Sequence, residues 1–440
     1  MIFRSSSLAL AGLLTLPATA GGFLLKEQSP RAQGLSYAGV SAARGTGAMY
    51  FNPAALAGIQ GREATLGFSF VAPGSEFFDG SANRTSLVPA PLRPVSGPAE
   101  HGNAAKSALL PALGAGWEVT PDVVLGISLN VPFGMVTEYD PAWVGRYHAL
   151  RSSLKTMDIA PTVAWRINSQ WSVGAAFVAR KAEAELTSAA DFGTIGALKG
   201  VPGLLPGKAD GEGRLKGDTW CYGSRLGLTW EPTSTLRLGL GYQSGTKGTL
   251  QGQATYLNVP TALAPVFAPT DIKADMNLPS SLSLGVEWAA TSSLSLHGEV
   301  ARTGWNTFKE LRVRFANGLA DNVTEEHWHD TLFAALGATW KVNGTWSLRT
   351  GVAYDEGAAP DDHRTPRIPD GNRVWASVGA GCQLTPNLSM DVAYSHLFVK
   401  NGPISLNPTG PTHPDFLRGS LQGETRNKID ILAVQAAWRF

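Results

Sequence analysis

The sequence predicts an all-β fold, a transmembrane antiparallel β-barrel of 14 strands whose lumen is plugged by an N-terminal hatch. Three observations lead to this prediction. Apolar and polar residues alternate with period two in fourteen stretches, short and long connections alternate between the stretches, and tryptophans stand beside the short connections. A chain with 50 glycines, 13 tryptophans and only 16% charged residues fits such a β-rich protein.

The first twenty residues have the order of a secretory signal peptide. Arg4 precedes an apolar run from Leu8 to Leu16, and Pro17 and Ala18-Thr19-Ala20 follow as a small-residue cleavage site. We expect residues 1–20 to be removed and the mature chain to start near Gly21. A buried N-terminal helix is the alternative.

The rest of the chain excludes several classes of protein. It has no run of about 18 apolar residues, so transmembrane helices are not expected. The net charge of +1 gives no indication of a nucleic-acid partner. Cys221 and Cys382 cannot form a disulfide framework, and whether they form one bridge stays open.

Residues 21–61 lack strand alternation and precede the first strand. A disordered tail should contain few apolar residues, whereas this segment contains Phe23, Leu35, Tyr37, Met49 and Phe51. We therefore expect a hatch at 21–61 that folds into the lumen of a barrel at 62–440, in preference to a disordered periplasmic tail. A barrel of this size would otherwise be a leaky pore.

The alternation that defines the strands is plainest at the C-terminus, where Leu432, Val434, Ala436, Trp438 and Phe440 share one face. The thirteen other stretches are Ala64–Phe70, Leu109–Val119, Val123–Val131, Met157–Ile167, Trp171–Ala179, Trp220–Trp230, Leu236–Tyr242, Leu282–Trp288, Leu294–Val300, Leu332–Trp340, Trp346–Tyr354, Val374–Leu384 and Leu388–Tyr394.

The connections distinguish two ends of the barrel. Short ones, such as Lys341-Val-Asn-Gly-Thr345, follow every even-numbered strand, and long ones, such as 73–106, 187–218 and 303–330, follow odd-numbered strands. Short periplasmic turns, long extracellular loops and an even number of strands are typical of barrels in the outer membrane of Gram-negative bacteria. A closed barrel pairs every backbone group without leaving an edge in the lipid.

Tryptophans mark one level of this barrel. Trp117, Trp165, Trp230, Trp288 and Trp340 end strands before short turns, Trp171 and Trp346 begin strands after them, and Trp438 is close to the C-terminus. Indole rings prefer the headgroup boundary, so a ring of them indicates an interfacial girdle. A soluble β-sandwich with core tryptophans is the alternative. The terminal Phe440 is of the kind that the barrel-assembly machinery recognises.

Several motifs resemble the FadL/TodX (OmpP1) family of outer-membrane transporters for long-chain fatty acids and other hydrophobic compounds. They are Glu27-Gln-Ser29, Tyr50-Phe-Asn-Pro-Ala54, Pro132-Phe-Gly134, Trp143-Val-Gly-Arg-Tyr147 and Arg367-Ile-Pro-Asp370. The resemblance covers the whole mature chain. It implies a transporter, not an enzyme, without a cofactor, in which ligand collects among the extracellular loops, enters the barrel, displaces the hatch and leaves sideways at a kink in the third strand.

The resemblance places the hatch motif on Asn52, Pro53 and Ala54 and the kink on Asn130, Val131, Pro132, Phe133 and Gly134. Proline fixes its own φ and restricts its neighbour, which gives the hatch a defined bend. In the third strand, a proline that cannot donate to the ladder and a glycine predict a gap in the pairing of the wall. The alternative is that Pro132 only ends the strand.

Two further sets of residues are predicted to handle ligand. Apolar side chains in the loop after the fifth strand need a partner, which is either ligand or a neighbouring loop. A carboxylate ligand needs a cation, but the position where the family has a basic residue falls near Ser188, which keeps uncharged aromatic hydrocarbons as alternative ligands. The capture residues are Phe192, Ile195, Leu198, Leu204 and Leu205, and the candidate cations are Arg146, Arg180, Lys181, Arg312 and Arg373.

Two other functions remain as alternatives. A barrel lipase or esterase is favoured only by His297 and His396 on strands, because the chain has no G-x-S-x-G or H-E-x-x-H motif. An open porin would need an empty lumen. His327 and His329 alone are too few to indicate a metal site, so no metal is predicted. The expected partners are a hydrophobic small molecule, outer-membrane lipid with lipopolysaccharide, and the assembly machinery, and a monomer is expected.

Overall fold

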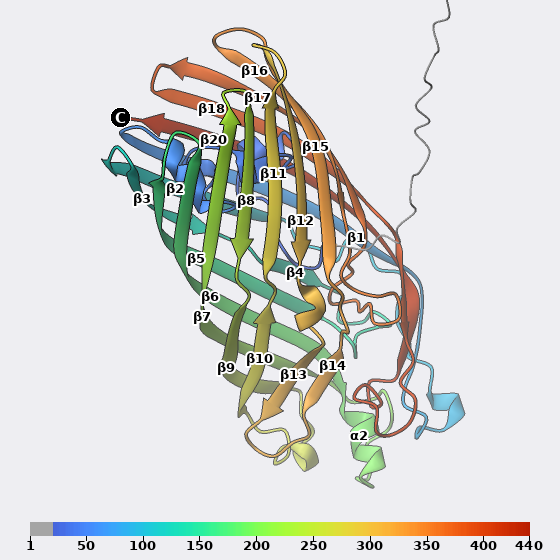
Figure 1. Ribbon diagram of the computed structural model, residues 1–440. Coiled ribbons are helices and arrows are strands. Elements are labelled where there is room, and N and C mark those ends of the chain that lie inside the picture. Colours follow the sequence, from blue (N-terminus) through green and yellow to red (C-terminus); the bar gives the residue numbers. More distant parts are fainter. Residues whose placement is uncertain (1–20) are drawn as a thin grey trace, which may run out of the picture.

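The computed structural model describes residues 21–440, so the predicted signal peptide lies outside the described residues. All strands belong to one antiparallel sheet that closes on itself as a tall barrel (Figure 1). The fourteen predicted stretches all fall within the strands of this ring, to within one residue, so the predicted fold is confirmed.

Fourteen strands form the ring, each paired with the next, and the last pairs with the first from Glu63↔Arg439 to Asn83↔Ser420. These strands are β1 (Arg62–Asn83), β2 (Ala108–Thr120), β3 (Val123–Asn130), β5 (Arg151–Arg166), β6 (Trp171–Asp191), β7 (Asp210–Thr233), β8 (Leu236–Gln243), β11 (Ser281–Ala289), β12 (Leu294–Thr303), β15 (Thr331–Lys341), β16 (Trp346–Asp355), β17 (Arg373–Thr385), β18 (Leu388–Val399) and β20 (Ser420–Arg439).

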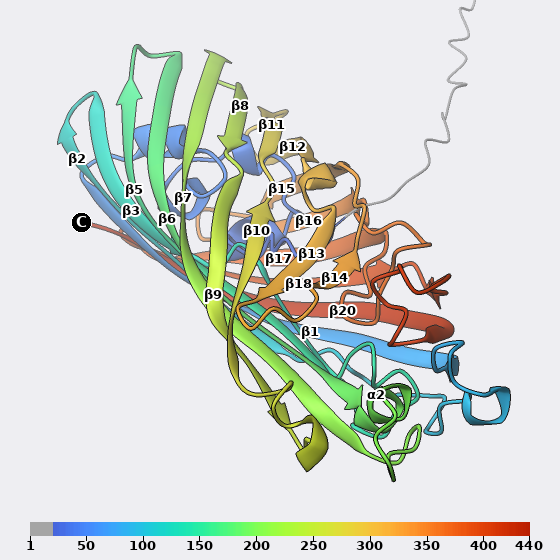
Figure 2. The same ribbon diagram turned by 90° about the horizontal axis from the view of Figure 1, so that it is seen from below.

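Additional strands raise the wall at the long-loop end, within connections that were predicted to be loops. They are β4 (Gly134–Glu138), β9 (Thr246–Leu257), β10 (Thr270–Leu278), β13 (Glu310–Phe315), β14 (Asn322–Glu325) and β19 (Gly402–Leu406). In this raised part β9 pairs with β7 and β10, and β10 pairs with β13. The wall is therefore taller on the β7 side, as Figures 1 and 2 show.

The helices are short and lie in the N-terminal segment and the loops. They are α1 (Pro30–Gln33), α2 (Phe192–Leu198) and the 3₁₀ turns η1 (Val40–Ala42), η2 (Thr46–Ala48), η3 (Pro53–Gly58), η4 (Ala90–Leu92), η5 (Thr261–Leu263) and η6 (Trp305–Thr307). Among residues 21–440, no helix has the length and apolar character that a membrane crossing requires.

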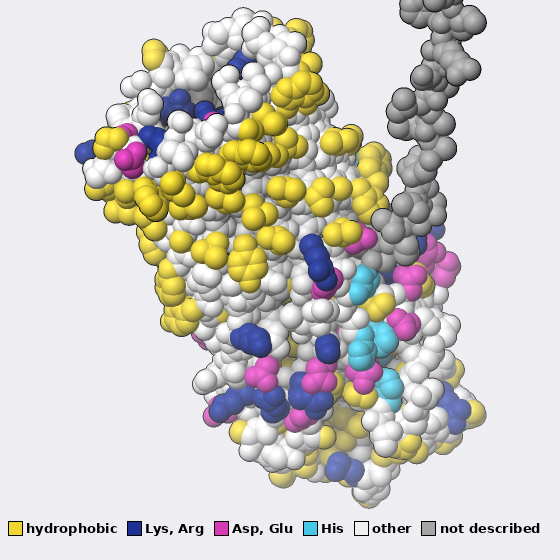
Figure 3. All heavy atoms as spheres, in the orientation of Figure 1, with side chains coloured by type: hydrophobic (Ala, Val, Ile, Leu, Met, Phe, Trp, Pro, Cys, Tyr) yellow, Lys and Arg dark blue, Asp and Glu magenta, His cyan; other side chains and the backbone are white. Residues whose placement is uncertain are grey.

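The outer face of the barrel carries the predicted apolar belt. Leu66, Leu284, Leu336 and Val378 point outward and are about half exposed, and apolar side chains cover the wall toward the short-turn end in Figure 3. The tryptophans beside the short turns are also exposed on this face, for example Trp340 at 53%, except for Trp171, which is half-buried. Both cysteines are unpaired, so they form no bridge.

Residues 21–61, the N-terminal segment, lie inside the wall at the short-turn end (blue in Figures 1 and 2). Its turns touch strands all around the ring: η2 meets β1 and β2, η3 meets β3, β5, β6 and β7, η1 meets β8 and β11, and α1 meets β17, β18 and β20. Most of its side chains are buried. The segment therefore crosses the lumen.

Glycines in the wall make room for this segment. A Cβ on Gly227 would lie 1.9 Å from Asn52 Oδ1, and a Cβ on Gly239 would lie 1.9 Å from Ser41 O. A side chain at Gly239 would collide with the backbone of the segment, and one at Gly227 would collide with the side chain of Asn52, so both positions favour glycine.

Candidate functional site

The motif Asn52-Pro53-Ala54 fastens the N-terminal segment to the wall. Asn52 Oδ1 accepts a hydrogen bond from the N–H of Ala54 and caps η3, whose first residue is Pro53. Asn52 Nδ2 donates to Ser41 O at 2.6 Å and to Leu228 O of β7 at 3.1 Å. One buried side chain thus joins two turns of the segment and a strand of the barrel.

The third strand breaks where the sequence predicts a kink. β3 ends at Asn130, and after Val131-Pro132-Phe133 the chain resumes as β4. β4 pairs with β5, whereas the ladder between β2 and β3 stops at Leu113↔Leu129. Within residues 21–440, the next contact across this seam is the bridge Ala105↔Thr137. The wall therefore has a gap in its pairing beside residues 108–112 of β2.

The start of the N-terminal segment satisfies the backbone of the kink from inside. Gln28 Oε1 accepts from the N–H of Val131 at 3.0 Å, and Gln28 Nε2 donates to Val131 O at 2.7 Å. The N–H of Leu25 donates to Pro132 O at 2.8 Å, and the N–H of Gly134 donates to Phe23 O at 3.1 Å. Residues 23–28 thereby replace part of the missing ladder.

Phe133, in the middle of the kink, is held by the wall on the other side. Its backbone N–H donates to Thr156 Oγ1 at 2.9 Å, and the guanidinium of Arg180 lies 4.8 Å from its ring centroid. Its ring also contacts Phe23 edge-on, with the centroids 6.1 Å apart. The kink is therefore a well-packed element with defined partners.

Two cavities meet at Phe23. The wall cavity, of about 700 Å³, lies at the gap and is lined by Leu109, Leu110, Val131 and Phe133 among others. The apolar chamber, of about 100 Å³, lies above it in the lumen and is lined mainly by Leu186, Leu215, Leu250, Ile272, Met276 and Phe308. Both are lined by Phe23, Met135, Leu154 and Ile368, so these residues form the partition between them.

The polar residues that line the chamber are Ser152, Ser153, Asp275, Asn277, Glu326 and Arg367, and we call Arg367 with Glu326 its polar end. Arg367 is buried, and its Nη1 donates to Ser152 Oγ at 3.0 Å and to the backbone O of Arg151 and of Thr187, both at 3.3 Å. Within residues 21–440 it forms no ion pair with a carboxylate. Burial raises the pKa of Glu326 to about 8, which favours the neutral carboxyl group over the carboxylate beside the arginine.

The five predicted cations are already paired. Arg146 pairs with Asp210, Arg180 with Asp158, Lys181 with Asp218, Arg312 with Glu310 and Asp321, and Arg373 with Asp370. Asp210, Asp158 and Asp218 are distant in the chain from their cations and Asp370 lies in a loop, so the sequence did not reveal these pairs. Glu310 is only two residues from Arg312, in the same strand. Arg367 was missed as a cation, although its motif was noted, and no local pattern marks it as unpaired.

The predicted capture residues divide into two groups. Phe192, the first residue of α2, is fully buried and packs against Phe267, with ring centroids 4.9 Å apart. Phe192 is therefore packed against a neighbouring loop. Leu198 and Leu205 are 43% and 58% exposed, and Ile195 and Leu204 are half-buried beside them. Only the latter four offer apolar surface at the long-loop end.

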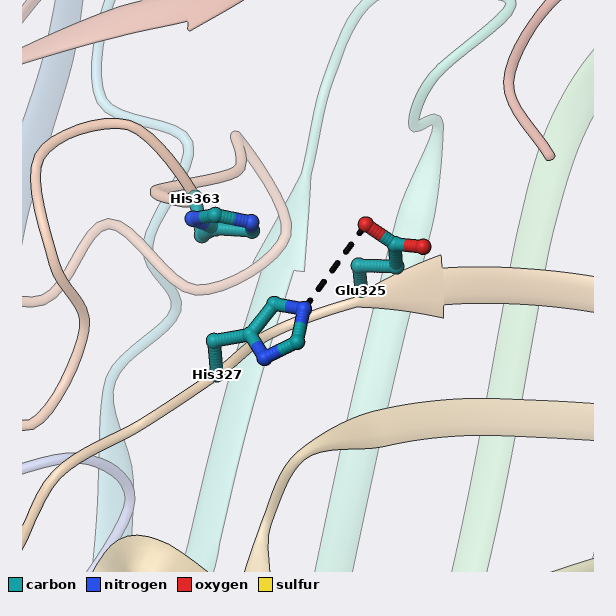
Figure 4. A group of neighbouring side chains, drawn as sticks. All are labelled: Glu325, His327 and His363. Carbon is teal, nitrogen blue, oxygen red and sulfur yellow. Dashed lines mark ion pairs between the residues drawn. The ribbon is translucent and has the colours of Figure 1, made fainter. Parts of the chain in front are cut away.

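One group of potential metal ligands occurs among the described residues. Glu325, His327 and His363 place one ligand atom each within 4.8 Å of one another, and Figure 4 shows the three side chains converging from two loops. From the sequence, only His327 and His329 were considered as possible metal ligands. His363 was not predicted as a ligand, because the loop that carries it is distant in the chain from His327.

Comparisons with known proteins agree with this architecture. The profile of the family described as "Outer membrane protein transport protein (OMPP1/FadL/TodX)" matches residues 11–440. The chain belongs to this family. It is 31% identical to the 47 kDa outer membrane protein of Pasteurella multocida (86% of this chain, 88% of that protein). It is 26% identical to the long-chain fatty acid transport protein of Escherichia coli K12 (92% and 94%).

Solved structures of the same family superpose on the chain. A FadL homologue from Pseudomonas aeruginosa matches with a TM-score of 0.84 at 26% identity, over 96% of this chain and all of that one. The toluene transporter TodX of Pseudomonas putida matches with a TM-score of 0.69 at 18% identity, over 95% and 99%, a likeness that concerns the fold. This family member is a multi-pass outer-membrane barrel and a transporter, not an enzyme.

Proposed function

We propose that this protein carries long-chain fatty acids or related hydrophobic compounds through the outer membrane by diffusion down their gradient. The observation that carries the proposal is the contact of the apolar chamber with the wall cavity across a shared partition, at the place where the wall lacks a ladder. A ligand that passes Phe23 reaches a gap facing the lipid. Such a ligand leaves sideways into acyl chains without crossing water.

The N-terminal segment acts as the hatch in this proposal. The chamber, at about 100 Å³, is smaller than the roughly 150 Å³ of an engineered cavity that binds benzene. Ligand therefore has to widen it. Phe23 is the lining residue that belongs to the N-terminal segment, and moving it draws on the same residues 23–28 that satisfy the kink. Because residues 23–28 take part in both, the partition opens and the kink loosens together.

Arg367 is the cation that we propose for a carboxylate ligand. It is charged at pH 7, because its pKa is lowered by burial only to about 9. Its side chain lines a mainly apolar chamber and forms no ion pair with a carboxylate in the described chain. A fatty acid with its head group at Arg367 would place its acyl chain among Leu215, Leu250 and Met276. Charge-assisted hydrogen bonds of this kind are among the strong ones.

Aromatic hydrocarbons are the second candidate ligand. The family includes toluene transporters, and the small chamber with its phenyl and aliphatic lining favours a compact ring over a long chain when the hatch is at rest. A neutral ring would leave Arg367 unused. The two ligand classes therefore differ in their dependence on this one residue.

Uptake measurements test the proposed function. Cells that lack their own transporter, with and without this chain, are given labelled oleate and toluene. We expect at least one compound to enter faster with the chain, and the rate to change in Asn52→Ala, whose side chain fastens the hatch, but not in Asn317→Ala in an exposed loop. Equal entry of both compounds with and without the chain would refute transport.

The two alternative functions make other predictions. An open porin would show large steady conductance in planar bilayers, whereas a plugged barrel shows almost none until residues 21–61 are deleted. A lipase would need a histidine that contacts a nucleophile in a known lipase motif. His396 contacts Asp430 and His297 contacts Thr339, and neither lies in such a motif. The family of transporters gives no support to the lipase.

The remaining partners follow from the surface. The apolar belt contacts lipid and, on its outer side, lipopolysaccharide. The barrel-assembly machinery is the expected receptor for the C-terminal strand, whose last residue, Phe440, is 61% exposed. A monomer suits a ring that closes within one chain.

A further inference from the structure

Three side chains from two loops converge on the outer surface of the long-loop end. Glu325 is the last residue of β14, His327 follows it in the same loop, and His363 lies in the loop between β16 and β17. Glu325 Oε2 lies 3.7 Å from His327 Nε2, and the rings of His327 and His363 have centroids 4.7 Å apart (Figure 4). Two imidazoles and a carboxylate form a common ligand set for zinc.

Two details of the backbone and its surroundings fit a ligand site. His327 has φ +48°, a left-handed conformation that a residue with a Cβ rarely adopts and that often occurs at functional positions. His363 Nδ1 lies 3.0 Å from Asp362 Oδ1. Histidines that bind metals usually direct their second nitrogen to a carboxylate, which fixes the tautomer. His363 Nδ1 has no directed hydrogen bond within the described chain, and a small rotation of the Asp362 carboxylate would supply one and leave His363 Nε2 for an ion.

We propose that Glu325, His327 and His363 bind one divalent transition-metal ion, with Zn²⁺ as the ion that the ligand set fits best. A tetrahedral zinc ion with bonds near 2.0–2.1 Å holds its ligand atoms about 3.4 Å apart. The three atoms now lie within 4.8 Å of one another, and the side chains of Glu325 and His327 are exposed enough to close that difference by rotation. Water would occupy the fourth position.

The ion would join the two loops that carry the polar end of the chamber. Along residues 325–328 the side chains alternate: Glu325 and His327 face outward, whereas Glu326 lines the chamber and Trp328 is buried against Phe23. The second loop carries His363 and, four residues later, Arg367. Metal binding on the outside therefore restrains the segments that place Glu326, Trp328 and Arg367 on the inside.

Titration of the full-length protein in detergent with ZnCl₂, and with CoCl₂ for its absorption spectrum, tests the site. We expect one ion per chain with a Kd of about 10 μM or tighter. His327→Ala and His363→Gln should each weaken binding by about 100-fold or more, and Asp362→Asn by about 10-fold, because it only orients His363. His413→Gln, in a different loop, is the matched control.

Hydrogen exchange of the same samples supplies a second readout. Zn²⁺ should slow exchange in residues 326–330 and 356–372 of the unaltered protein but not of His327→Ala. Binding weaker than about 1 mM, or binding that His327→Ala and His363→Gln leave unchanged, would overturn the proposal. Binding without any change in exchange would overturn the proposed restraint of the loops.

Discussion

The two halves of the barrel differ in how the chain fills them. At the short-turn end the strands form an unbroken ring, and backbone of the N-terminal segment rests directly on wall glycines such as Gly227 and Gly239. At the long-loop end the wall is broken between β3 and β4, between β8 and β9 and between β12 and β13, and apolar side chains surround cavities. The short-turn half is therefore closed by the N-terminal segment. The long-loop half, which we call the yielding half, contains cavities that a ligand can widen.

The largest effect should come from filling the contact between segment and wall. In Gly227→Val the new side chain would collide with Asn52, and overpacking of this kind costs about 1–3 kcal/mol or more. We expect the N-terminal segment to leave its seat and bilayer conductance to rise from near zero to steady channels. Gly344→Val, in an open turn with no atom near its Cβ, should stay closed. Equal conductance of both variants would contradict the distinction between the halves.

The next effect concerns the chamber. Arg367→Gln removes a charge-assisted interaction worth about 1.5–3 kcal/mol, so affinity for oleate should fall on the order of 10- to 100-fold while affinity for its methyl ester is kept. Fluorescence competition in detergent measures both ligands. Arg312→Gln, which removes an equal charge from a solvent-facing ion pair, should change neither. An equal loss of affinity for the acid and the ester would show that Arg367 stabilises the loops and does not bind the carboxylate.

A smaller effect is expected where the halves meet. Gln28→Leu leaves the N–H and O of Val131 without their side-chain partner, which costs about 1–3 kcal/mol of local stability. Hydrogen exchange of residues 131–134 should become faster, and uptake should rise. Gln33→Leu removes a hydrogen bond from the same segment to Ile431 O and should leave the kink unchanged. Unchanged exchange at the kink in Gln28→Leu would show that the segment does not hold it.

The smallest effect is a dependence of stability on pH. Because the folded pKa of Glu326 is raised to about 8, the folded protein retains this proton over a pH range in which the unfolded chain has lost it. Its contribution to stability is therefore full below about pH 4, falls as the pH rises toward 8 and levels off above it. Glu326→Gln should flatten this part of the curve, as thermal melts between pH 5 and 9 would show. A slope that is the same in both proteins would contradict it.

The sequence predicted the closed half of the molecule better than the yielding half. Alternation is regular where one face meets lipid, so β15, which contains Trp340, was predicted to within one residue at each end. For β20 only the end near Trp438 was predicted, because the strand begins at Ser420, before the predicted stretch. Above the membrane the pattern is weak in β9. β10 and β13 do alternate with period two, but they lie within long connections that were interpreted as loops. The gap at Pro132 was predictable because proline acts locally.

The candidate site was predicted less completely, because its chemistry depends on partners that are distant in the chain. Arg180 is paired because Asp158 faces it from the neighbouring strand, and Phe192 is buried because a loop 75 positions later brings Phe267 to it. Arg367 stands out only when the five predicted cations have been assigned their acids. Such differences are properties of the assembled barrel and have no local signature.

The seam between the first and last strands has a consequence for how the barrel is made. Arg62 and Phe440 exchange backbone hydrogen bonds, and Gln33 donates to Ile431 O, so residues synthesised first are fastened to residues synthesised last. Contacts of such long sequence separation form slowly. The N-terminal segment must therefore wait near the growing sheet until the final strand arrives. When the first and last strands pair, the wall is completed and the N-terminal segment is enclosed in the lumen, in a single late step of biogenesis.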